Sequence, residues 1–569
     1  MPSARAGTPR KAARKPAPAR REVDYDVLVV GGGSNGTGLA RDLAKRGLSV
    51  LLCEKGDFAR GATGNSSGMI HGGPRYLLND VDTTKHSCED SGYIQRIAPH
   101  IIFRVPFLVP VESGGMYGKL APLLHDVYFS VYDRYSPLKN GIPHARISVD
   151  EMLNIEPGLS GNFLGGVTLD EWGIDCGRLC LLNVLDAEAH GAEIRTYTEV
   201  IGLLRDEAGA VVGGRLRRTG QVEVEEVHTR AVVNCAGPWA EKVAGLGGGG
   251  VRLRPGKGVH LIYEKRLTNF AIITEAVDGR QVFVMPYQNE TWIGTTDDDY
   301  YGDLDDLWAT EDEIRYLREA IERLLPGLAQ QRLIGTRVGV RNTLYEWGEL
   351  EDELSRRYAI VDHASLGAPG LFSLAGGKLA SFRIQAQEAA DAACDFLGVA
   401  ASCETHLHKL PGGDDLPNDL ELARAYGITP LAARRLVARH GSLAPRVLDL
   451  GRETATGYSV VCPCEPTLEC EVRYCLRNEH VVRLGDLMTR CRIAMGPCQG
   501  LHCGLRAAQI FAEERGLDPT SEREALMDLL GRRWRSARPV LTGQQLAEAE
   551  LVMTQYTGLW QAPAQTPLA

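Results

Sequence analysis

The stretch Tyr25-Asp-Val-Leu-Val-Val-Gly-Gly-Gly-Ser-Asn-Gly36 decides the fold of this chain. Its first half, residues 25–30, is a largely apolar run of the kind that forms a buried parallel strand. Its second half spaces Gly31, Gly33 and Gly36 as G-x-G-x-x-G. These glycines permit a tight turn and let a pyrophosphate approach the N-terminus of a following helix. A lone glycine motif is weak evidence, so the flanking residues carry the prediction.

The residues that follow complete a βαβ unit. Residues 37–46 have the periodicity of a helix that ends at Gly47, and residues 48–53 form a second apolar run. Glu54 stands at the end of that run, where a carboxylate can accept hydrogen bonds from ribose hydroxyls. Strand, helix, strand and acid in this order predict a dinucleotide-binding fold of the α/β class.

A glycine-rich polar segment at residues 60–77 favours FAD over NAD as the dinucleotide. Small residues let such a segment lie along an extended cofactor without steric clashes. The segment resembles the corresponding part of the FAD-dependent glycerol-3-phosphate dehydrogenases, where Ser-Ser precedes an apolar pair and His-Gly-Gly-x-Arg-Tyr-Leu. The matching residues are Ser66, Ser67, Met69, Ile70, His71, Gly72, Gly73, Arg75, Tyr76 and Leu77. Pro74 departs from the family pattern, which usually has an apolar residue at this position.

The resemblance continues in order along residues 25–450. The matching stretches are Asn234-Cys-Ala-Gly-Pro-Trp239, Lys257-Gly-Val-His260, a hairpin at residues 282–287 and 291–297, Gly339-Val-Arg341 (where Asn342 replaces a proline), and residues 376–383. It implies a Rossmann-like FAD-binding domain of the D-amino-acid-oxidase/glutathione-reductase type with a mixed-sheet substrate domain. These two parts interleave over residues 23–405, and a helical cap domain is expected at 406–455.

The resemblance also implies a reaction, the oxidation of sn-glycerol 3-phosphate to dihydroxyacetone phosphate by hydride transfer to FAD. Such a reaction needs a base for the hydroxyl proton and cations for the phosphate. His260 is our first choice for the base and His71 the second, and Arg341 and Lys378 complete the predicted catalytic set. The predicted substrate-binding residues are Arg75, Tyr76, Thr296 and Arg383. The acidic run at residues 297–299 is interpreted as a solvated turn rather than a metal site.

The predicted contacts to FAD come from the glycine turn, the segment after the second strand, and later turns brought to the same cofactor. They are Gly31, Gly33, Ser34, Asn35, Gly36, Glu54, Lys55, Thr63, Ser66, Ser67, Ile70, His71, Gly72, Val200, Ala236, Gly237, Trp239, Gly377 and Leu379. Most of these positions are carried over from the resemblance, while the glycines and Glu54 follow from the βαβ pattern itself.

A cysteine tetrad near the C-terminus has the spacing C-x-C…C-x4-C and consists of Cys462, Cys464, Cys498 and Cys503. Four soft thiolates suit an iron–sulfur cluster or structural zinc, and four unligated thiols are the remaining possibility. The segment resembles the bacterioferritin-associated-ferredoxin-like [2Fe–2S] domain that extends the large catalytic subunit of anaerobic glycerol-3-phosphate dehydrogenases. This domain is expected at residues 456–510, with a helical extension at 511–569.

A two-electron flavin beside a one-electron cluster implies that the cluster relays electrons, although a cluster that only staples the fold is an alternative. The family resemblance implies partner subunits that carry these electrons to membrane quinone. Two further functions stay open. The same cations could bind the carboxylate of a 2-hydroxy acid such as 2-hydroxyglutarate. A flavin and cluster could also sense redox state or deliver iron without acting as an enzyme.

Composition and charge limit the partners and the cellular compartment that the protein can have. The 569 residues carry a net charge of −10, which argues against binding to nucleic acid. The cysteines outside the tetrad are scattered. Cys470 and Cys475 are interpreted as helix-face or core residues, and Cys491 as a spare. With no visible signal peptide, these features indicate a reducing cytoplasm. The implied relay to membrane quinone further predicts that the protein is peripheral at the inner face of the cell membrane. Residues 1–22 are basic and are interpreted as a disordered tail, with attraction to anionic lipid or a presequence as alternatives.

Overall fold

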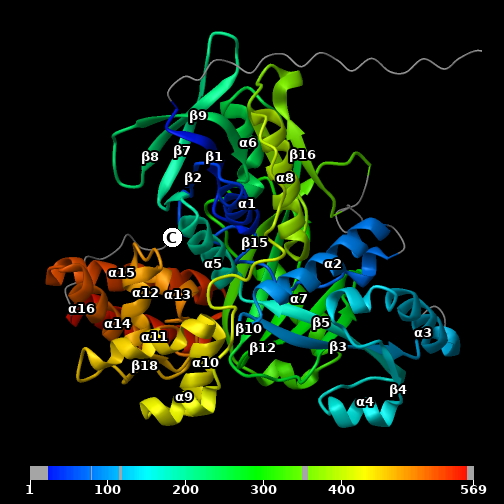
Figure 1. Ribbon diagram of the computed structural model, residues 1–569. Helices are drawn as coiled ribbons and strands as arrows, with labels where there is room; N and C mark the ends of the chain where they lie inside the picture. The colour runs from blue at the N-terminus through cyan, green and yellow to red at the C-terminus, as the bar shows by residue number, and fades with distance from the viewer. Residues whose placement is uncertain (1–22, 78–79, 115–117, 349–355, 560–569) are drawn as a thin grey trace, which may run out of the picture.

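The computed structural model describes residues 23–77, 80–114, 118–348 and 356–559. The basic tail at residues 1–22 and the end of the chain at 560–569 therefore lie outside the described part. Figure 1 shows two large sheets, one around β1, β2 and β9 and the other around β3, β5, β10 and β12, with the C-terminal helices beside the second. This arrangement confirms the predicted α/β fold with a mixed-sheet second domain and helices at the C-terminal end.

The first sheet contains the predicted βαβ unit. Its strand order is β16-β17-β9-β1-β2-β6, and all neighbours are parallel except β16 with β17. The bounds are β1 Tyr25–Val30, β2 Val50–Cys53, β6 Glu193–Arg195, β9 Glu225–Asn234, β16 Tyr358–Asp362 and β17 Leu371–Gly376. Two further strands, β7 (Thr198–Arg205) and β8 (Val211–Arg218), extend from β9 in antiparallel pairs. The first strand matches its predicted bounds, and the second begins two residues later than predicted.

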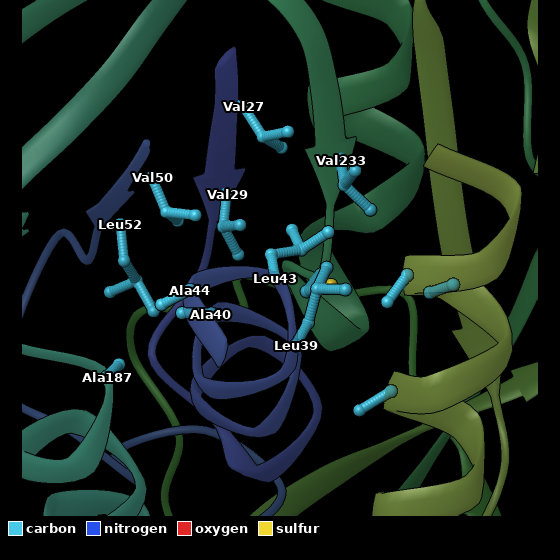
Figure 2. Packing of buried hydrophobic residues seen from close by; sticks show 14 of the residues in the cluster. Val27, Val29, Leu39, Ala40, Leu43, Ala44, Val50, Leu52, Ala187 and Val233 are labelled. Carbon is cyan, nitrogen blue, oxygen red and sulfur yellow. The ribbon is translucent and has the colours of Figure 1, made fainter. Parts of the chain in front are cut away.

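Helix α1 (Ser34–Lys45) fixes the geometry of the glycine turn. It packs against α5 (Cys176–Ala189) and α8 (Phe382–Leu397), and Figure 2 shows Leu39 and Leu43 beneath the strand side chains Val29 and Val233. The helix begins earlier than predicted because the last glycine of the motif lies inside its first turn. Truncating either buried leucine to alanine would cost about 2–5 kcal/mol.

The second sheet forms the substrate domain. Its order is β14-β10-β13-β12-β11-β3-β5-β4, and β15 (Leu333–Leu344) also pairs with β10 (Leu253–Tyr263). The remaining bounds are β3 Ile102–Glu112, β4 Ala145–Ile147, β5 Phe163–Ile174, β11 Ala271–Glu275, β12 Gln281–Tyr287, β13 Glu290–Gly294 and β14 Asp298–Asp299. The antiparallel pairing of β12 with β13 confirms the predicted hairpin.

The C-terminal part is helical and is joined to the first domain by buried ion pairs. Its elements are α9 Asp419–Tyr426, α10 Pro430–His440, α11 Ala444–Asp449, β18 Val460–Cys462, β19 Thr467–Leu468, α12 Glu469–Asn478, α13 Leu487–Arg490, α14 Gly504–Arg515, α15 Pro519–Ala537 and α16 Gly543–Leu559. The guanidinium of Arg178 lies 2.8 Å from Glu479, and that of Arg490 lies 2.6 Å from Asp57. Among the described residues no helix is both long and apolar enough to cross a membrane.

Two hydrophobic cores hold this C-terminal part together. One joins α9, α10 and α11 to Leu468, Cys470 and Tyr474, so the expected cap and cysteine domains share a core across residue 455. The other joins the cysteine segment to α14 and α15. Cys475 is buried in this second core, as its interpretation as a core residue required, and Cys491 is buried there too.

Candidate active site

The glycine turn between β1 and α1 leaves no room for side chains. Gly31 has a φ of +111°, and a Cβ there would lie 2.6 Å from the carbonyl oxygen of Cys235. A Cβ on Gly36 would overlap the carbonyl oxygen of Gly31. The backbone nitrogen of Ser34 already donates to the Thr63 hydroxyl at 3.1 Å, which closes the turn from the other side. The turn thus presents the N-terminus of α1 to a phosphate.

Glu54, at the end of β2, is held by the same turn. Its carboxylate accepts hydrogen bonds from the backbone nitrogens of Gly32 at 2.6 Å and Gly56 at 2.8 Å. Burial raises the pKa of Glu54, although these two hydrogen bonds oppose the effect. The carboxylate is therefore positioned at the sheet edge, where the ribose of a dinucleotide would lie.

A cavity of about 590 Å³ begins at this turn and runs between the two sheets. The predicted cofactor contacts that line it are Gly31, Gly33, Ser34, Asn35, Glu54, Lys55, Thr63, Ser66, Ser67, His71, Val200, Ala236, Gly237, Trp239, Gly377 and Leu379. Gly36, Ile70 and Gly72 do not line it. Gly36 shapes the turn, Ile70 is in a hydrophobic core, and Gly72 packs against Cys88 and Tyr132.

His260 stands in the wall of this cavity as a neutral imidazole. It lies on β10, is 4% exposed, and its Nε2 is 2.9 Å from the Ser67 hydroxyl. Burial, followed by the charges of Arg341 and Arg337, lowers its pKa to about 3. The imidazole is therefore unprotonated at physiological pH, as a general base must be. The negative charge of a bound phosphate would raise this pKa towards the range in which a histidine takes up a proton readily.

Asp297 holds two arginines at the cavity and was missed as a site residue. Its carboxylate oxygens lie 2.9 Å from Arg341 and 2.6 Å from Arg356. Arg341 also donates to Thr295, and Arg356 donates to the hydroxyl of Thr343 at 2.6 Å. The interpretation of residues 297–299 as a solvated turn is wrong for Asp297, because these ion pairs draw its carboxylate into the cavity wall.

Lys378 enters the cavity from the turn before α8. Its ammonium lies 4.8 Å from the ring centre of Tyr76 and 3.5 Å from the carbonyl oxygen of His71. Pro74 opens the short 3-10 turn that carries Tyr76, a position where its missing N–H costs nothing. The departure of Pro74 from the family pattern is therefore compatible with this wall of the cavity.

Two more residues of the cavity wall need comment: one departs from the family pattern, and the other was not predicted from the sequence. Asn342, the second departure from the family pattern, donates to the carbonyl oxygen of Gly376 at 3.1 Å and so ties β15 to the Gly-Gly turn. Gln385 was not predicted, yet it lines the cavity and accepts a hydrogen bond from Asn35 at 3.0 Å. It also donates to the carbonyl oxygen of Lys378 at 2.8 Å.

Two predicted substrate ligands lie outside the cavity. The guanidinium of Arg383 is buried 2.7 Å from the Asp90 carboxylate on α2 (Val81–Ile97), so its charge is already neutralised. Thr296 is 1% exposed, accepts from the backbone nitrogen of Val259 and donates to the carbonyl oxygen of Lys257. Both predictions placed these side chains wrongly. The prediction for Arg75 concerns a side chain outside the described part.

The cysteine tetrad is brought together at the start of α14. Its thiols interact in a chain, Cys462 with Cys503, Cys503 with Cys498, and Cys498 with Cys464. The hydrogen bond between Cys503 and Cys498 lowers the pKa of Cys498 and raises that of Cys503, and backbone N–H groups also point at the sulfurs. One such group is that of Ala494, 3.3 Å from the Cys503 sulfur.

The chain packs closely beside one cysteine of the tetrad. A Cβ on Gly496 would overlap the Cβ of Cys464. Four soft thiolates supported by amide donors fit a tetrathiolate metal centre.

The dinucleotide turn, the long cavity and the neutral histidine among cations define a flavoprotein oxidoreductase. A family model described as "FAD dependent oxidoreductase" matches residues 26–383, and one described as "C-terminal domain of alpha-glycerophosphate oxidase" matches residues 403–522. A relative from Escherichia coli (strain K12), named as a subunit of anaerobic glycerol-3-phosphate dehydrogenase, is 32% identical over 94% of this chain and 96% of its own. A similarly named relative from Haloferax volcanii is 34% identical over 92% of this chain and 89% of its own.

A solved structure agrees with these relatives. The glycerol-3-phosphate dehydrogenase from Bacillus halodurans, complexed with FAD, superposes with a TM-score of 0.74 at 25% identity, over 92% of this chain and 97% of that one. The chain therefore belongs to the FAD-dependent oxidoreductases. Within them it belongs to the glycerol-3-phosphate dehydrogenase family that includes the two anaerobic relatives.

Proposed function

We propose that this protein oxidises sn-glycerol 3-phosphate to dihydroxyacetone phosphate with FAD as the hydride acceptor. The observation that carries the proposal is the placement of Arg341, Arg356 and Lys378 around one cavity with the neutral imidazole of His260. Three cations against the carboxylate of Asp297 leave this end of the cavity electropositive, as a phosphate dianion requires. The names of the Escherichia coli and Bacillus halodurans relatives support the same substrate.

The reaction divides between cofactor and side chains. Bound FAD supplies the acceptor for the hydride that leaves C2 of the substrate. His260 takes the hydroxyl proton, and the arginines and Lys378 hold the phosphate so that the carbon faces the cofactor. Ser67 orients the imidazole through its hydrogen bond. The carbonyl product keeps the phosphate and leaves with no change in the protein's covalent structure.

We further propose that the cysteine tetrad holds a [2Fe–2S] cluster that passes electrons from the flavin to partner subunits and then to quinone. Backbone amides pointing at the sulfurs and the contacts that link the four thiols support a thiolate centre. The Escherichia coli relative is named as one subunit of an enzyme, which supports the existence of partners. We place the protein at the inner face of the cell membrane on the same grounds.

An anaerobic titration with glycerol 3-phosphate tests both proposals. Flavin and iron–sulfur absorption should bleach together in the wild-type protein. The Cys498→Ser variant should bleach only at the flavin, because it lacks one of the four thiolates. If the flavin stays oxidised with glycerol 3-phosphate but bleaches with a 2-hydroxy acid, the substrate is wrong. If no small alcohol or acid reduces a flavin that dithionite does reduce, the protein is a sensor rather than a dehydrogenase.

The Asp297→Ala variant should bind substrate poorly. Without this carboxylate, Arg341 and Arg356 lose the group that fixes both guanidiniums, and their mutual repulsion moves them off the phosphate position. We expect kcat/KM for glycerol 3-phosphate to fall about 10- to 100-fold, mostly through KM. Steady-state kinetics with an artificial acceptor measures this. Asp299→Ala is the matched control, because that carboxylate pairs with Arg254 instead. Equal losses in the two variants would contradict a specific role for Asp297.

A further inference from the structure

A second cavity lies between the flavin-binding part and the cysteine segment. Its volume is about 280 Å³, and its walls come from both parts of the chain. It shares Arg60, Asn65, Ser66 and Trp292 with the first cavity, so these four residues are the partition between the two spaces. The second cavity therefore lies between the proposed flavin site and the cysteine segment.

Strand β15 reaches both cavities from one face. Side chains at alternate positions of a strand point the same way. Arg341 therefore faces the first cavity and Arg337 the second, while Gly339 between them packs on Asn65, where a Cβ would lie 2.7 Å away. Figure 1 shows this strand near the middle of the molecule, where it pairs with β10 of the second sheet.

A stack of rings and guanidiniums crosses the second cavity. Arg337 lies 4.6 Å from the ring centre of Trp292, whose ring stacks on Tyr287 at 4.0 Å. Arg492 lies over the Tyr287 ring, 5.5 Å from its centre. Each guanidinium is thus placed over an aromatic ring that is itself buried. The stack leads from the wall of the flavin cavity to the cysteine segment.

At its far end the stack touches residues beside the tetrad. Arg492 is paired at 3.0 Å with Glu465, the residue after Cys464. Arg533 on α15 contacts the sulfur of Met495 at 3.8 Å and donates to Gln499, the residue after Cys498. In each cysteine pair of the tetrad, the residue that directly follows one cysteine therefore contacts a buried arginine.

This buried group carries more positive than negative charge. Its arginines are Arg337, Arg435, Arg492 and Arg533, and its carboxylates are Glu290 and Glu465. Among the described residues no carboxylate lies within 4 Å of Arg337, Arg435 or Arg533. Burial lowers the pKa of all three, that of Arg533 to about 10. Buried cations without anionic partners are costly, so a group of this kind needs a nearby anion.

We infer that Arg533, with Arg492 and Arg337 behind it, is the electrostatic counterpart of the metal centre at the tetrad and favours its reduced form. The inference rests on the proposed [2Fe–2S] cluster, which with four thiolates is doubly negative when oxidised and triply negative after gaining one electron. The electron comes from the reduced flavin, which gives up its two electrons one at a time. A buried cation stabilises the added charge more strongly in a low-dielectric site than it would in water.

Reductive titration of the wild-type protein and the Arg533→Met variant, followed by electron paramagnetic resonance, tests this. Methionine keeps the length and loses the charge. We expect the equilibrium between reduced and oxidised cluster to move at least tenfold towards the oxidised form, about 59 mV for one electron. Arg533→Lys should recover most of the shift. The control is Arg535→Met on the same helix, whose side chain is 47% exposed and paired with Asp306, and it should change the equilibrium less than twofold.

The outcomes separate the inference from the function on which it rests. If the wild-type protein contains no iron, the relay proposal fails. The arginines then face another anionic group, such as zinc bound by the four thiolates. If the cluster is present and its potential is the same in Arg533→Met, the inference is overturned. If Arg533→Met does not retain iron, Arg337→Met carries the test, because it leaves the cysteine segment untouched. It should move the equilibrium at least twofold in the same direction, and no shift there would overturn the inference.

Discussion

The Gly36→Ala variant should fold without FAD and show no dehydrogenase activity. A methyl group at this position overlaps the carbonyl oxygen of Gly31, which is backbone and cannot rotate away. The turn has to open, and the N-terminus of α1 then no longer faces the pyrophosphate. Overpacking costs about 1–3 kcal/mol, which a protein of this size can survive while the cofactor site cannot. The absorbance ratio of flavin to protein should fall below about a tenth of the wild-type value.

The matched control is a glycine in a helix with open space around it. Gly245 lies in α6 (Ala240–Leu246), and a Cβ there has no atom within 4 Å. Gly245→Ala should keep its full flavin content and unfold at the wild-type temperature or slightly above it. Full flavin in Gly36→Ala would show that the turn tolerates a side chain and that the glycine spacing is not what holds the cofactor.

The second large effect is expected at the proposed base. His260→Asn should slow reduction of the flavin by glycerol 3-phosphate about 10²- to 10⁴-fold, with substrate affinity little changed. The wild-type imidazole is unprotonated because burial lowers its pKa to about 3, and the phosphate of the bound substrate would raise that pKa towards the range of an effective base. Asparagine preserves the polar contact with Ser67 and removes the basicity. Stopped-flow measurement of anaerobic flavin bleaching gives the rate directly.

Two companion variants make this result specific. Ser67→Ala removes the 2.9 Å hydrogen bond that orients the imidazole and should cost about tenfold. His71→Asn changes the second candidate, which also lines the cavity, and should cost less than tenfold. If His71→Asn is the slow variant and His260→Asn is not, the proton goes to His71 and the assignment made here is wrong.

Local sequence determined the flavin-binding half because its constraints are local. The glycine spacing, the apolar runs and Glu54 lie within about thirty residues, and the backbone geometry that they require is the same wherever such a turn occurs. The first strand followed from its apolar pattern, and the hairpin of the substrate domain followed from the family resemblance. The cysteine tetrad was equally visible, because spacing and residue type suffice to mark thiolates that can meet.

The ion pairs of charged residues could not be predicted from the sequence, because their partners are far apart in the chain and come together only in the folded structure. Arg383 is adjacent to a turn that borders the cavity, yet it is neutralised by Asp90, 293 positions earlier in the chain. Asp297 reads as part of an acidic run, and only folding brings Arg341 and Arg356 to its carboxylate. Whether an arginine near a site binds substrate or serves the structure depends on whether the fold pairs its guanidinium with a buried carboxylate.

The sequence by itself thus determined the class of cofactor, the family and the identity of the thiolates, since these depend on contiguous patterns. The tertiary structure alone decided which cations face the substrate cavity and which are neutralised by buried carboxylates. It also decided that β15, the hairpin of β12 and β13, and α15 together place a group of buried arginines and aromatic rings between the flavin cavity and the tetrad. The physical reason is that electrostatic partnership depends on distance and burial, which chain separation does not encode.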